Sequence, residues 1–316
     1  MERFEISCKD GWRIQLKRYP GLRPVLFVHG MGANSSNFDL NPKWSLARYL
    51  NDRGYDCWIV ELRGRGRSRP PDGLRRPDWN FEDFLLKDLT AAVEFMRSHN
   101  PRPYHWIGHS MGGMLGYCWA IRNPGPQPES LVLFGTPLGF DPAQWALRLW
   151  GMAVQVHRML PTVDQRTIGR LAFPLMNKNR RALNFFLRYL ANPDNIEDQV
   201  ARDIFDRLVT NESAGIILQF ADWVRNGHVR SADRSFDYTE NLDRVTQPVL
   251  LISGESDRMA PPAVAEKFIP RLGSRKVRHV VLRHDGGFSC DYGHGDLVLG
   301  CRAPEEVYPL VAGWLE

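Results

Sequence analysis

The stretch that decides the fold is YHWIGHSMGG, residues 104–113. Its first half is apolar and strand-like, and a helical pattern begins at Met111, directly after Ser110. A strand, then Gly-x-Ser-x-Gly, then a helix is the order of a nucleophile elbow, a sharp turn that exposes a serine hydroxyl at the carboxyl end of a strand. Gly108 and Gly112 lack the Cβ atoms that would clash where strand and helix approach. We therefore predict that Ser110 is a nucleophile.

The composition is that of an ordinary soluble globular protein. A chain of 316 residues is long enough for one large domain with an insertion, and its formal net charge is only +5. No apolar run approaches the length of a membrane span, and the first residues lack the apolar core of a signal peptide. The five cysteines are scattered without metal-binding spacing, which predicts reduced thiols and no metal site. We expect a cytoplasmic protein without a transmembrane segment.

Arginines are concentrated in one loop that follows an apolar run. They are Arg63, Arg65, Arg67, Arg69, Arg75 and Arg76. Such a cluster could contact nucleic acid, but no nucleic-acid-binding motif accompanies it. The simpler interpretation is a solvated loop, and we expect no nucleic-acid partner.

Short apolar runs alternate with helical patterns along much of the chain. The runs typical of strands cover residues 4–8, 12–19, 24–28, 55–62, 131–134, 248–252 and 276–282. The helical patterns outside the elbow cover residues 45–53, 81–98, 261–272 and 304–315. This alternation predicts an α/β fold with a mostly parallel, doubly wound sheet that carries helices on both faces.

Functional residues of such sheets gather at the carboxyl ends of the strands. Three predicted strands end in unusual motifs: H-G-M-G at 29–32, G-H-S-M-G-G at 108–113 and S-G-E-S-D at 253–257. The sequence therefore predicts that one edge of the sheet carries the functional site.

The alternation of strands stops between residues 138 and 246, where helical patterns dominate. We predict a core domain formed by residues 1–137 and 247–316, with a helical cap of residues 138–246 inserted over the catalytic edge. The aromatic side chains of the cap could line an apolar substrate pocket, although any one of them is more simply explained as cap core. The candidates for substrate binding are Trp145, Trp150, Phe220 and Trp223.

A serine hydroxyl is a poor nucleophile until a base removes its proton, and the base needs a third group to hold its ring. After an elbow serine, the acid and then the histidine should follow along the chain. Asp257 comes just after a late strand, and His294 lies in the loop after the next strand. We therefore predict Asp257 and His294 as the partners of Ser110.

Several residues of the same segments are alternatives to these partners. Glu255 is the rival acid, and His284 lies too near the end of its strand to be the preferred base. Three further carboxylates could contact His294, namely Asp285, Asp291 and Asp296. Asp296 is more simply explained as an anchor of the loop, and His109 as a structural residue of the elbow.

An oxyanion hole needs two backbone N–H groups that point at the developing alkoxide. One should come from Met111, the residue after the nucleophile. The other should come from Met31, in the H-G-M-G loop. Because the donors are backbone groups, methionine is acceptable at both positions.

Taken together, these motifs resemble the α/β-hydrolase superfamily. H-G-M-G, E-L-R-G-R-G-R-S, G-H-S-M-G-G, S-G-E-S-D and the histidine loop follow in the order of that family. More loosely, residues 45–58, 81–88, 236–242 and 294–308 are similar to the acid lipase and steryl-ester hydrolase group. The chain departs from that group in lacking a secretion signal and in carrying R-G-R-G-R-S, the pattern of general hydrolases.

The resemblance implies hydrolysis of a small-molecule carboxylic ester with an apolar acyl or alcohol part, through an acyl-enzyme and without a cofactor. Serine at position 110 argues against polyester synthases, whose nucleophile is cysteine, and against epoxide and haloalkane hydrolases, which need aspartate there. Two other functions remain open. The same three residues would serve an acyltransferase or thioesterase acting on carrier-bound acyl groups, and the basic loop could then meet an acidic carrier. A non-catalytic ligand-binding member of the fold is the third possibility.

Overall fold

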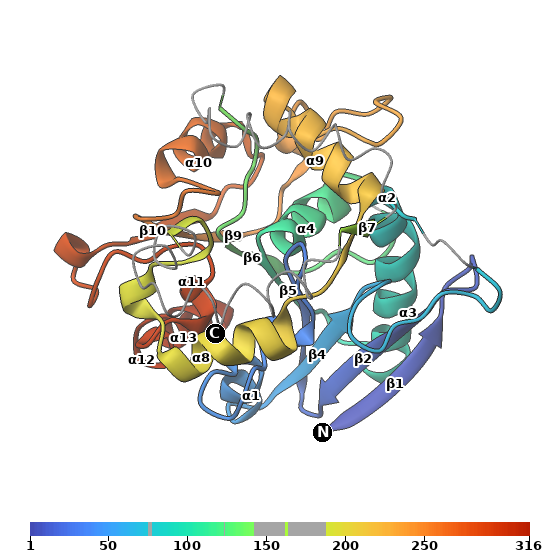
Figure 1. The fold of residues 1–316 in the computed structure, drawn as a ribbon, viewed down its shortest axis with the longest axis horizontal. Coiled ribbons are helices and arrows are strands. Elements are labelled where there is room, and N and C mark those ends of the chain that lie inside the picture. The colour runs from blue at the N-terminus through green and yellow to red at the C-terminus, as the bar shows by residue number, and fades with distance from the viewer. Residues whose placement is uncertain (75–77, 123, 142–161, 164–187) are drawn as a thin grey trace.

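The computed structural model describes residues 1–74, 78–122, 124–141, 162–163 and 188–316 (Figure 1). Its centre is an eight-stranded sheet in the order β1-β2-β4-β3-β5-β6-β9-β10. The strands are β1 (Glu2–Ser7), β2 (Arg13–Tyr19), β3 (Arg23–Val28), β4 (Tyr55–Glu61), β5 (His105–His109), β6 (Ser130–Phe134), β9 (Val249–Gly254) and β10 (Val277–Leu282). The hairpin of β1 and β2 is antiparallel and joins β4 in antiparallel fashion, and every pair from β4 to β10 is parallel. The predicted fold class is confirmed.

The sheet reverses its direction of growth between β3 and β5. The chain moves outward from β3 to β4 and then returns to place β5 on the other side of β3. In a doubly wound sheet, the crevice at such a reversal lies outside the carboxyl ends of the strands and is the usual binding position. The H-G-M-G loop follows β3 and the elbow follows β5, so both motifs lie at this reversal.

Helices cover both faces of the sheet because successive strand residues point to opposite sides. Trp58 and Trp106 belong to one buried apolar cluster, whereas their neighbours Ile59 and Ile107 belong to the other. The first cluster is covered by α2 (Phe81–Asp83), η2 (Phe84–Asp88), α3 (Leu89–His99), α4 (Met111–Arg122), α9 (Ala214–Asn226) and α10 (Pro262–Phe268). The second is covered by α1 (Leu46–Asn51), α11 (Asp296–Leu299), α12 (Ala303–Glu306) and α13 (Tyr308–Leu315).

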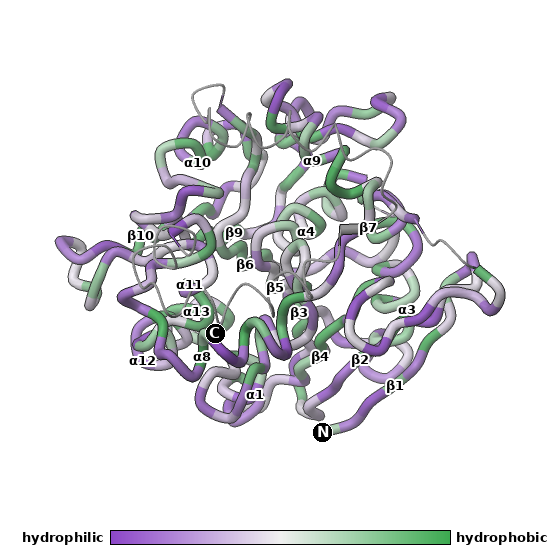
Figure 2. Tube along the Cα trace, viewed as in Figure 1, coloured by the Kyte–Doolittle hydropathy of each residue, from purple (hydrophilic) through white to green (hydrophobic). Residues whose placement is uncertain are grey.

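Apolar residues are concentrated in the centre of the molecule. Figure 2 shows the central strands in green and much of the periphery, including the hairpin of β1 and β2, in purple. None of the helices within the described ranges is long and apolar enough to cross a membrane. The helix expected over 304–315 is divided into α12 and α13, because Pro309 lies in the first turn of α13 and has no N–H to continue an earlier helix.

The part of the chain predicted as a cap begins after β6. Its described helices are η4 (Pro193–Asn195), α8 (Asp198–Asp203), the π-helical turn η5 (Ile204–Leu208), α9 and η6 (Leu242–Arg244). A short strand β8 (Glu212–Ser213) pairs antiparallel with β7 (Thr162–Val163). In Figure 1 the yellow α8 crosses in front of the sheet, whereas α9 shares the first apolar cluster with α2 to α4. The division into core and cap stays a prediction.

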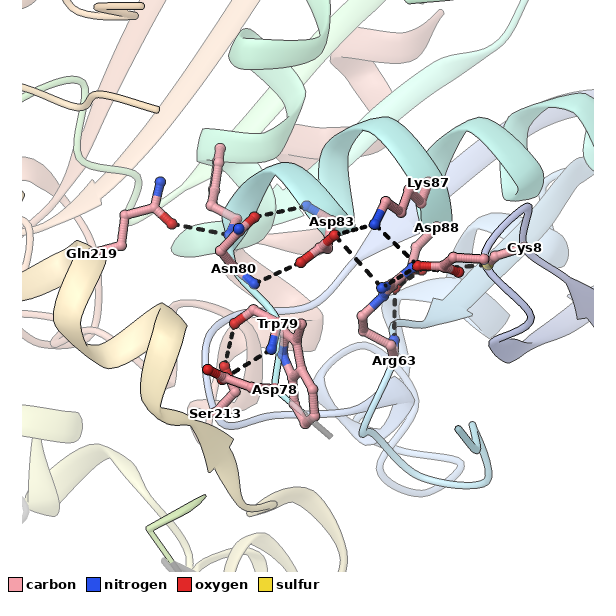
Figure 3. A network of polar contacts seen from close by, with 12 residues as sticks. Cys8, Arg63, Asp78, Trp79, Asn80, Asp83, Lys87, Asp88, Ser213 and Gln219 are labelled. Carbon is pink, nitrogen blue, oxygen red and sulfur yellow. Dashed lines mark hydrogen bonds and ion pairs between the residues drawn. The ribbon is translucent and has the colours of Figure 1, made fainter. Parts of the chain in front are cut away.

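The arginine-rich loop is not simply solvated, and that expectation is wrong for Arg63 and Arg65. Arg63 is 2% exposed, and its side chain lies 2.7 Å from Asp88 and 2.8 Å from Asp10. Figure 3 shows this guanidinium among Asp88, Asp83 and Cys8. Arg65 is fully buried and forms an ion pair with Glu212. Because the neutralising carboxylates come from distant parts of the sequence, the local composition could not reveal them.

Replacing Asp88 by alanine should lower the free energy of unfolding by about 3 kcal/mol or more, because it leaves the buried Arg63 guanidinium with weaker compensation. Urea unfolding followed by circular dichroism measures this change. The control is Asp72→Ala, which removes an exposed partner of Arg13 and should change the free energy of unfolding little. Equal effects of the two substitutions would contradict the structural role of the buried pair.

Candidate active site

Ser110 lies at the sharp turn between β5 and α4. Its φ angle of 54° is in the left-handed region, which a residue other than glycine adopts only under strain. The backbone around it is held on both sides. The Ser110 N–H donates to the Phe134 carbonyl at 2.8 Å, and the Ser110 carbonyl accepts from Gly113 and Met114 at 3.0 and 3.1 Å. The strain is therefore maintained by β6 and by the first turn of α4.

The two glycines of the elbow stand where the sequence required small residues. A Cβ on Gly112 would lie 1.9 Å from the carbonyl oxygen of Val28, and a Cβ on Gly108 would lie 2.3 Å from the carbonyl oxygen of Gly112. Real Cβ atoms do not approach a carbonyl oxygen so closely, and backbone cannot move as freely as a side-chain tip. The steric reason predicted for both glycines is confirmed.

Asp257 and His294 meet at the carboxyl ends of β9 and β10. Asp257 Oδ2 lies 2.8 Å from His294 Nδ1, while Asp257 Oδ1 accepts the backbone N–H groups of Met259 and Ala260 at 2.8 Å each. Both residues are buried, with 3% and 9% exposure. The aspartate therefore caps the turn after β9 with one oxygen and holds the imidazole with the other.

The charge of Asp257 determines how His294 titrates. Burial opposes the imidazolium, but the attraction of Asp257 and its hydrogen bond outweigh burial, so the pKa of His294 is raised above its ordinary value. A histidine whose Nδ1–H is held by a carboxylate presents Nε2 as the basic atom. This pair therefore has the form that a general base requires.

The structure separates the alternative residues from this pair. Glu255 and His284 are exposed, and Asp285 is paired with Arg283. Asp291 accepts the backbone N–H of His284 at 2.8 Å. The only one of these that is buried close to His294 is Asp296, whose oxygens accept the Gly293 N–H at 3.0 and 2.9 Å. Asp296 thus anchors the histidine loop, as the sequence suggested.

His109 has a larger part in the site than its sequence position indicated. Its ring lies 4.8 Å from the ring of His294, and its Nε2 lies 3.1 Å from the His294 carbonyl oxygen. Its Nδ1 lies 3.1 Å from Asn37 Oδ1. Burial lowers the pKa of His109 to about 3, so the ring is neutral and its single N–H can donate to only one of these two oxygens. His109 joins the elbow to the histidine loop and to Asn37, and no sequence spacing signals either contact.

The loop after β3 lies against the nucleophile. A Cβ on Gly30 would lie 3.3 Å from the Cβ of Ser110. Asn37 Oδ1 accepts the Gly30 N–H at 3.1 Å, and Glu212 accepts the Gly32 N–H at 3.1 Å. Neither the Met31 N–H nor the Met111 N–H donates to an acceptor among the described residues. Met111 thus follows Ser110 directly, and Met31 follows Gly30, the residue that lies against Ser110.

The predicted substrate-binding aromatic residues are only partly described. Trp145 and Trp150 lie outside the described residues. Phe220 and Trp223 lie on α9, where both are buried in the apolar cluster, and Trp223 Nε1 donates to the Arg230 carbonyl at 2.7 Å. Within the described ranges, no group of three histidine, cysteine or acidic side chains is arranged to hold a metal ion.

Comparisons with known proteins identify the family of this chain. A family model described as the alpha/beta hydrolase fold matches residues 23–293, and the chain belongs to the α/β-hydrolase family. Gastric triacylglycerol lipase from Homo sapiens is 31% identical over 97% of this chain and 85% of its own length. Triacylglycerol lipase 1 from Arabidopsis thaliana is 30% identical, over 96% of this chain and 84% of its own length. The resemblance to the superfamily, and within it to acid lipases, is confirmed.

A solved structure shows the same architecture. The esterase EaEST from Exiguobacterium antarcticum has a TM-score of 0.66 with this chain at 17% identity, and the match covers 98% of both chains. At this identity the likeness concerns the fold alone.

The substitution Gly112→Ala tests the elbow. It should destabilise the protein by about 2–3 kcal/mol or more, since the new methyl group meets the backbone of β3 rather than a movable side chain. The matched control is Gly313→Ala in α13, where a Cβ meets nothing within 4 Å. The control should stabilise the helix by about 0.5–1 kcal/mol. Urea unfolding of both variants measures the difference, and a tolerated Gly112→Ala would contradict the steric argument.

Proposed function

We propose that this protein hydrolyses carboxylic esters with an apolar acyl or alcohol part, through an acyl-enzyme formed on Ser110. The observations that carry the proposal are the strained Ser110 at the end of β5 and the Asp257–His294 hydrogen bond of 2.8 Å, with the ring of His109, the residue before Ser110, 4.8 Å from the ring of His294. The chain is a carboxylic ester hydrolase by its relatives, two of which are named triacylglycerol lipases. A triacylglycerol is an ester with apolar acyl chains, and this supports the class of substrate.

In the acylation step, Ser110 Oγ attacks the ester carbonyl carbon while His294 Nε2 accepts the hydroxyl proton. The carbonyl electron pair moves onto oxygen, and the Met31 and Met111 N–H groups stabilise the resulting oxyanion. When this tetrahedral intermediate collapses, the bond to the alcohol oxygen breaks and the alcohol leaves with the proton from His294. The acyl group remains on Ser110.

In the deacylation step, His294 takes a proton from water as the water oxygen attacks the acyl carbon. Collapse of the second tetrahedral intermediate releases the carboxylic acid and returns the proton to Ser110. Throughout, Asp257 keeps the hydrogen on Nδ1 of His294 and stabilises the imidazolium that forms in each step. The reaction as proposed uses no cofactor.

The acyl or alcohol part of the substrate would lie under residues 138–246, the proposed cap. Of the four aromatic residues predicted to line the pocket, we retain Trp145, Trp150 and Phe220 as proposed lining residues. The burial of Trp223 and the hydrogen bond of its indole N–H favour a structural role for that residue. A cytoplasmic location also belongs to the proposal, and it is supported by the free state of all five cysteines.

Acyl transfer from a carrier has less support. The sequence argument for it was a basic loop that could meet an acidic carrier. Arg63 and Arg65 of that loop are buried in ion pairs within the protein, and Arg69 is paired with Glu5 at 2.7 Å. Most of the described charge in the loop is therefore neutralised internally.

A fluorophosphonate probe tests the nucleophile directly, because it reacts with an activated serine. We expect labelling of the wild-type protein at Ser110, located by peptide mass spectrometry, and its loss in His294→Ala. Ser110→Ala should reduce hydrolysis of p-nitrophenyl butyrate by about 10³-fold or more. Wild-type activity in Ser110→Ala would refute the proposed mechanism.

The raised pKa of His294 predicts the pH dependence of hydrolysis. Because only the neutral imidazole can accept the serine proton, kcat/KM should fall as the pH falls through the pKa of His294, which Asp257 raises above the ordinary histidine value. In Asp257→Asn the carboxylate is lost and burial dominates, so the acid limb should move to lower pH while the rate at its plateau drops. A limb that does not move would show that Asp257 is not the partner that sets this pKa.

A further inference from the structure

The loop that carries Met31 is held by a segment about 180 residues further along the chain. The Thr210 N–H donates to the Gly32 carbonyl at 2.8 Å, and the Gly32 N–H donates to Glu212 Oε2 at 3.1 Å. Asn34 Nδ2 donates to the Arg207 carbonyl at 2.6 Å. Both polar groups of the Gly32 backbone are therefore bound by residues 207–212.

Glu212 is a fully buried carboxylate with three polar partners in the described residues. Its Oε1 forms the ion pair with Arg65 and accepts the Ser213 N–H at 3.0 Å, while Oε2 accepts the Gly32 N–H. Arg65, also fully buried, donates to the Asn211 carbonyl as well. A buried ion pair costs desolvation energy and is weak as a source of net stability. What this pair supplies is a carboxylate oxygen at a fixed position beside Gly32.

The peptide groups around the Met31 N–H are each held by a side chain. The Gly30 carbonyl, which shares a peptide plane with the Met31 N–H, accepts from His29 Nδ1 at 2.9 Å. His29 Nε2 accepts the Leu62 N–H at 3.3 Å, which leaves the hydrogen of the neutral ring on Nδ1. On the other side, Glu212 fixes the plane that contains the Gly32 N–H. The Met31 N–H lies in the first of these planes, and the second plane restrains Met31 from its other side. Together they fix the direction in which the Met31 N–H points.

We propose that Glu212, oriented by Arg65, is a positioning residue for the oxyanion hole. This inference rests on the proposed function, because an oxyanion hole contributes to catalysis only if Ser110 forms a tetrahedral intermediate. A hydrogen bond to a carboxylate is stronger than one to a neutral acceptor, so it restrains the Gly32 peptide more firmly than a water or an amide would. The residue does not touch the substrate. It acts through the Gly32 backbone on the Met31 donor.

The test compares Glu212→Gln with the wild-type protein. The glutamine has the same shape, but its single oxygen cannot serve both the Gly32 N–H and the Arg65 guanidinium. We expect kcat for p-nitrophenyl butyrate to fall about 10- to 100-fold, as for a donor that is misplaced rather than deleted, with little change in KM. The acid limb of the pH profile should stay in place, because the contact between Asp257 and His294 is intact. Binding of phenylboronic acid, whose serine adduct places an oxygen in the hole, should weaken in parallel.

The matched control is Asp56→Asn. Asp56 is also a fully buried carboxylate, and it binds Arg18 at 2.8 Å and Asn100 at 2.9 Å. Asp56 lies near the amino end of β4, whereas the site lies at the carboxyl ends of the parallel strands. We expect this variant to lose stability in urea unfolding but to keep kcat and the affinity for phenylboronic acid.

The outcomes separate this inference from the proposed function. A folded Glu212→Gln protein with wild-type kcat and boronate affinity would overturn the positioning role, as would an equal loss of kcat in Asp56→Asn. Glu212→Ala, where it folds, should lose at least as much activity as Glu212→Gln, and a smaller loss would contradict the role. A wild-type protein without Ser110-dependent turnover would overturn the proposed function first, and the inference with it.

Discussion

The close approach of the elbow to β3 is the constraint on which the site depends. Gly112 passes so near the Val28 carbonyl that no side chain fits, and this contact sets where α4 begins. The position of α4 in turn forces Ser110 into the left-handed region with its backbone bound to β6. Ser110 is thus fixed by backbone packing between neighbouring strands, before any polar side chain contributes. Strain at such a position persists only where the surrounding structure over-determines it.

Polar contacts then assemble the rest of the site around that serine. Asp257 orients His294 from the end of β9, and the His109 ring lies between the His294 carbonyl and Asn37, whose Oδ1 accepts the Gly30 N–H. These groups are buried, and a buried hydrogen bond between well-placed partners is costly to break. The arrangement therefore favours a rigid site in which His294 and the loop after β3 keep fixed positions relative to Ser110.

Residues 190–212 connect two parts of the site that lie far apart in sequence. At one end, Asp296 of the histidine loop accepts the Asn192 N–H at 2.9 Å and Asn195 Nδ2 at 2.8 Å. Asp296 is fully buried, and this burial raises its pKa to about 6. At the other end, Glu212 holds the Gly32 backbone. The helices between these ends, α8 and η5, connect the histidine loop to the H-G-M-G loop after β3 (Figure 1).

The sequence by itself determined the sheet, the elbow and the order of Ser110, Asp257 and His294, because these depend on local patterns: apolar runs, glycines at a tight turn, and polar residues at strand ends. Tertiary structure alone decided which partner each buried charge has. Arg63 and Arg65 look like solvated loop residues until Asp88 and Glu212 are brought against them. The contacts of His109 and Glu212 with the site likewise join segments whose separation in sequence carries no signal. The sequence pattern around a charged residue or a histidine does not indicate which distant residue it will contact, so only the folded structure reveals that partner.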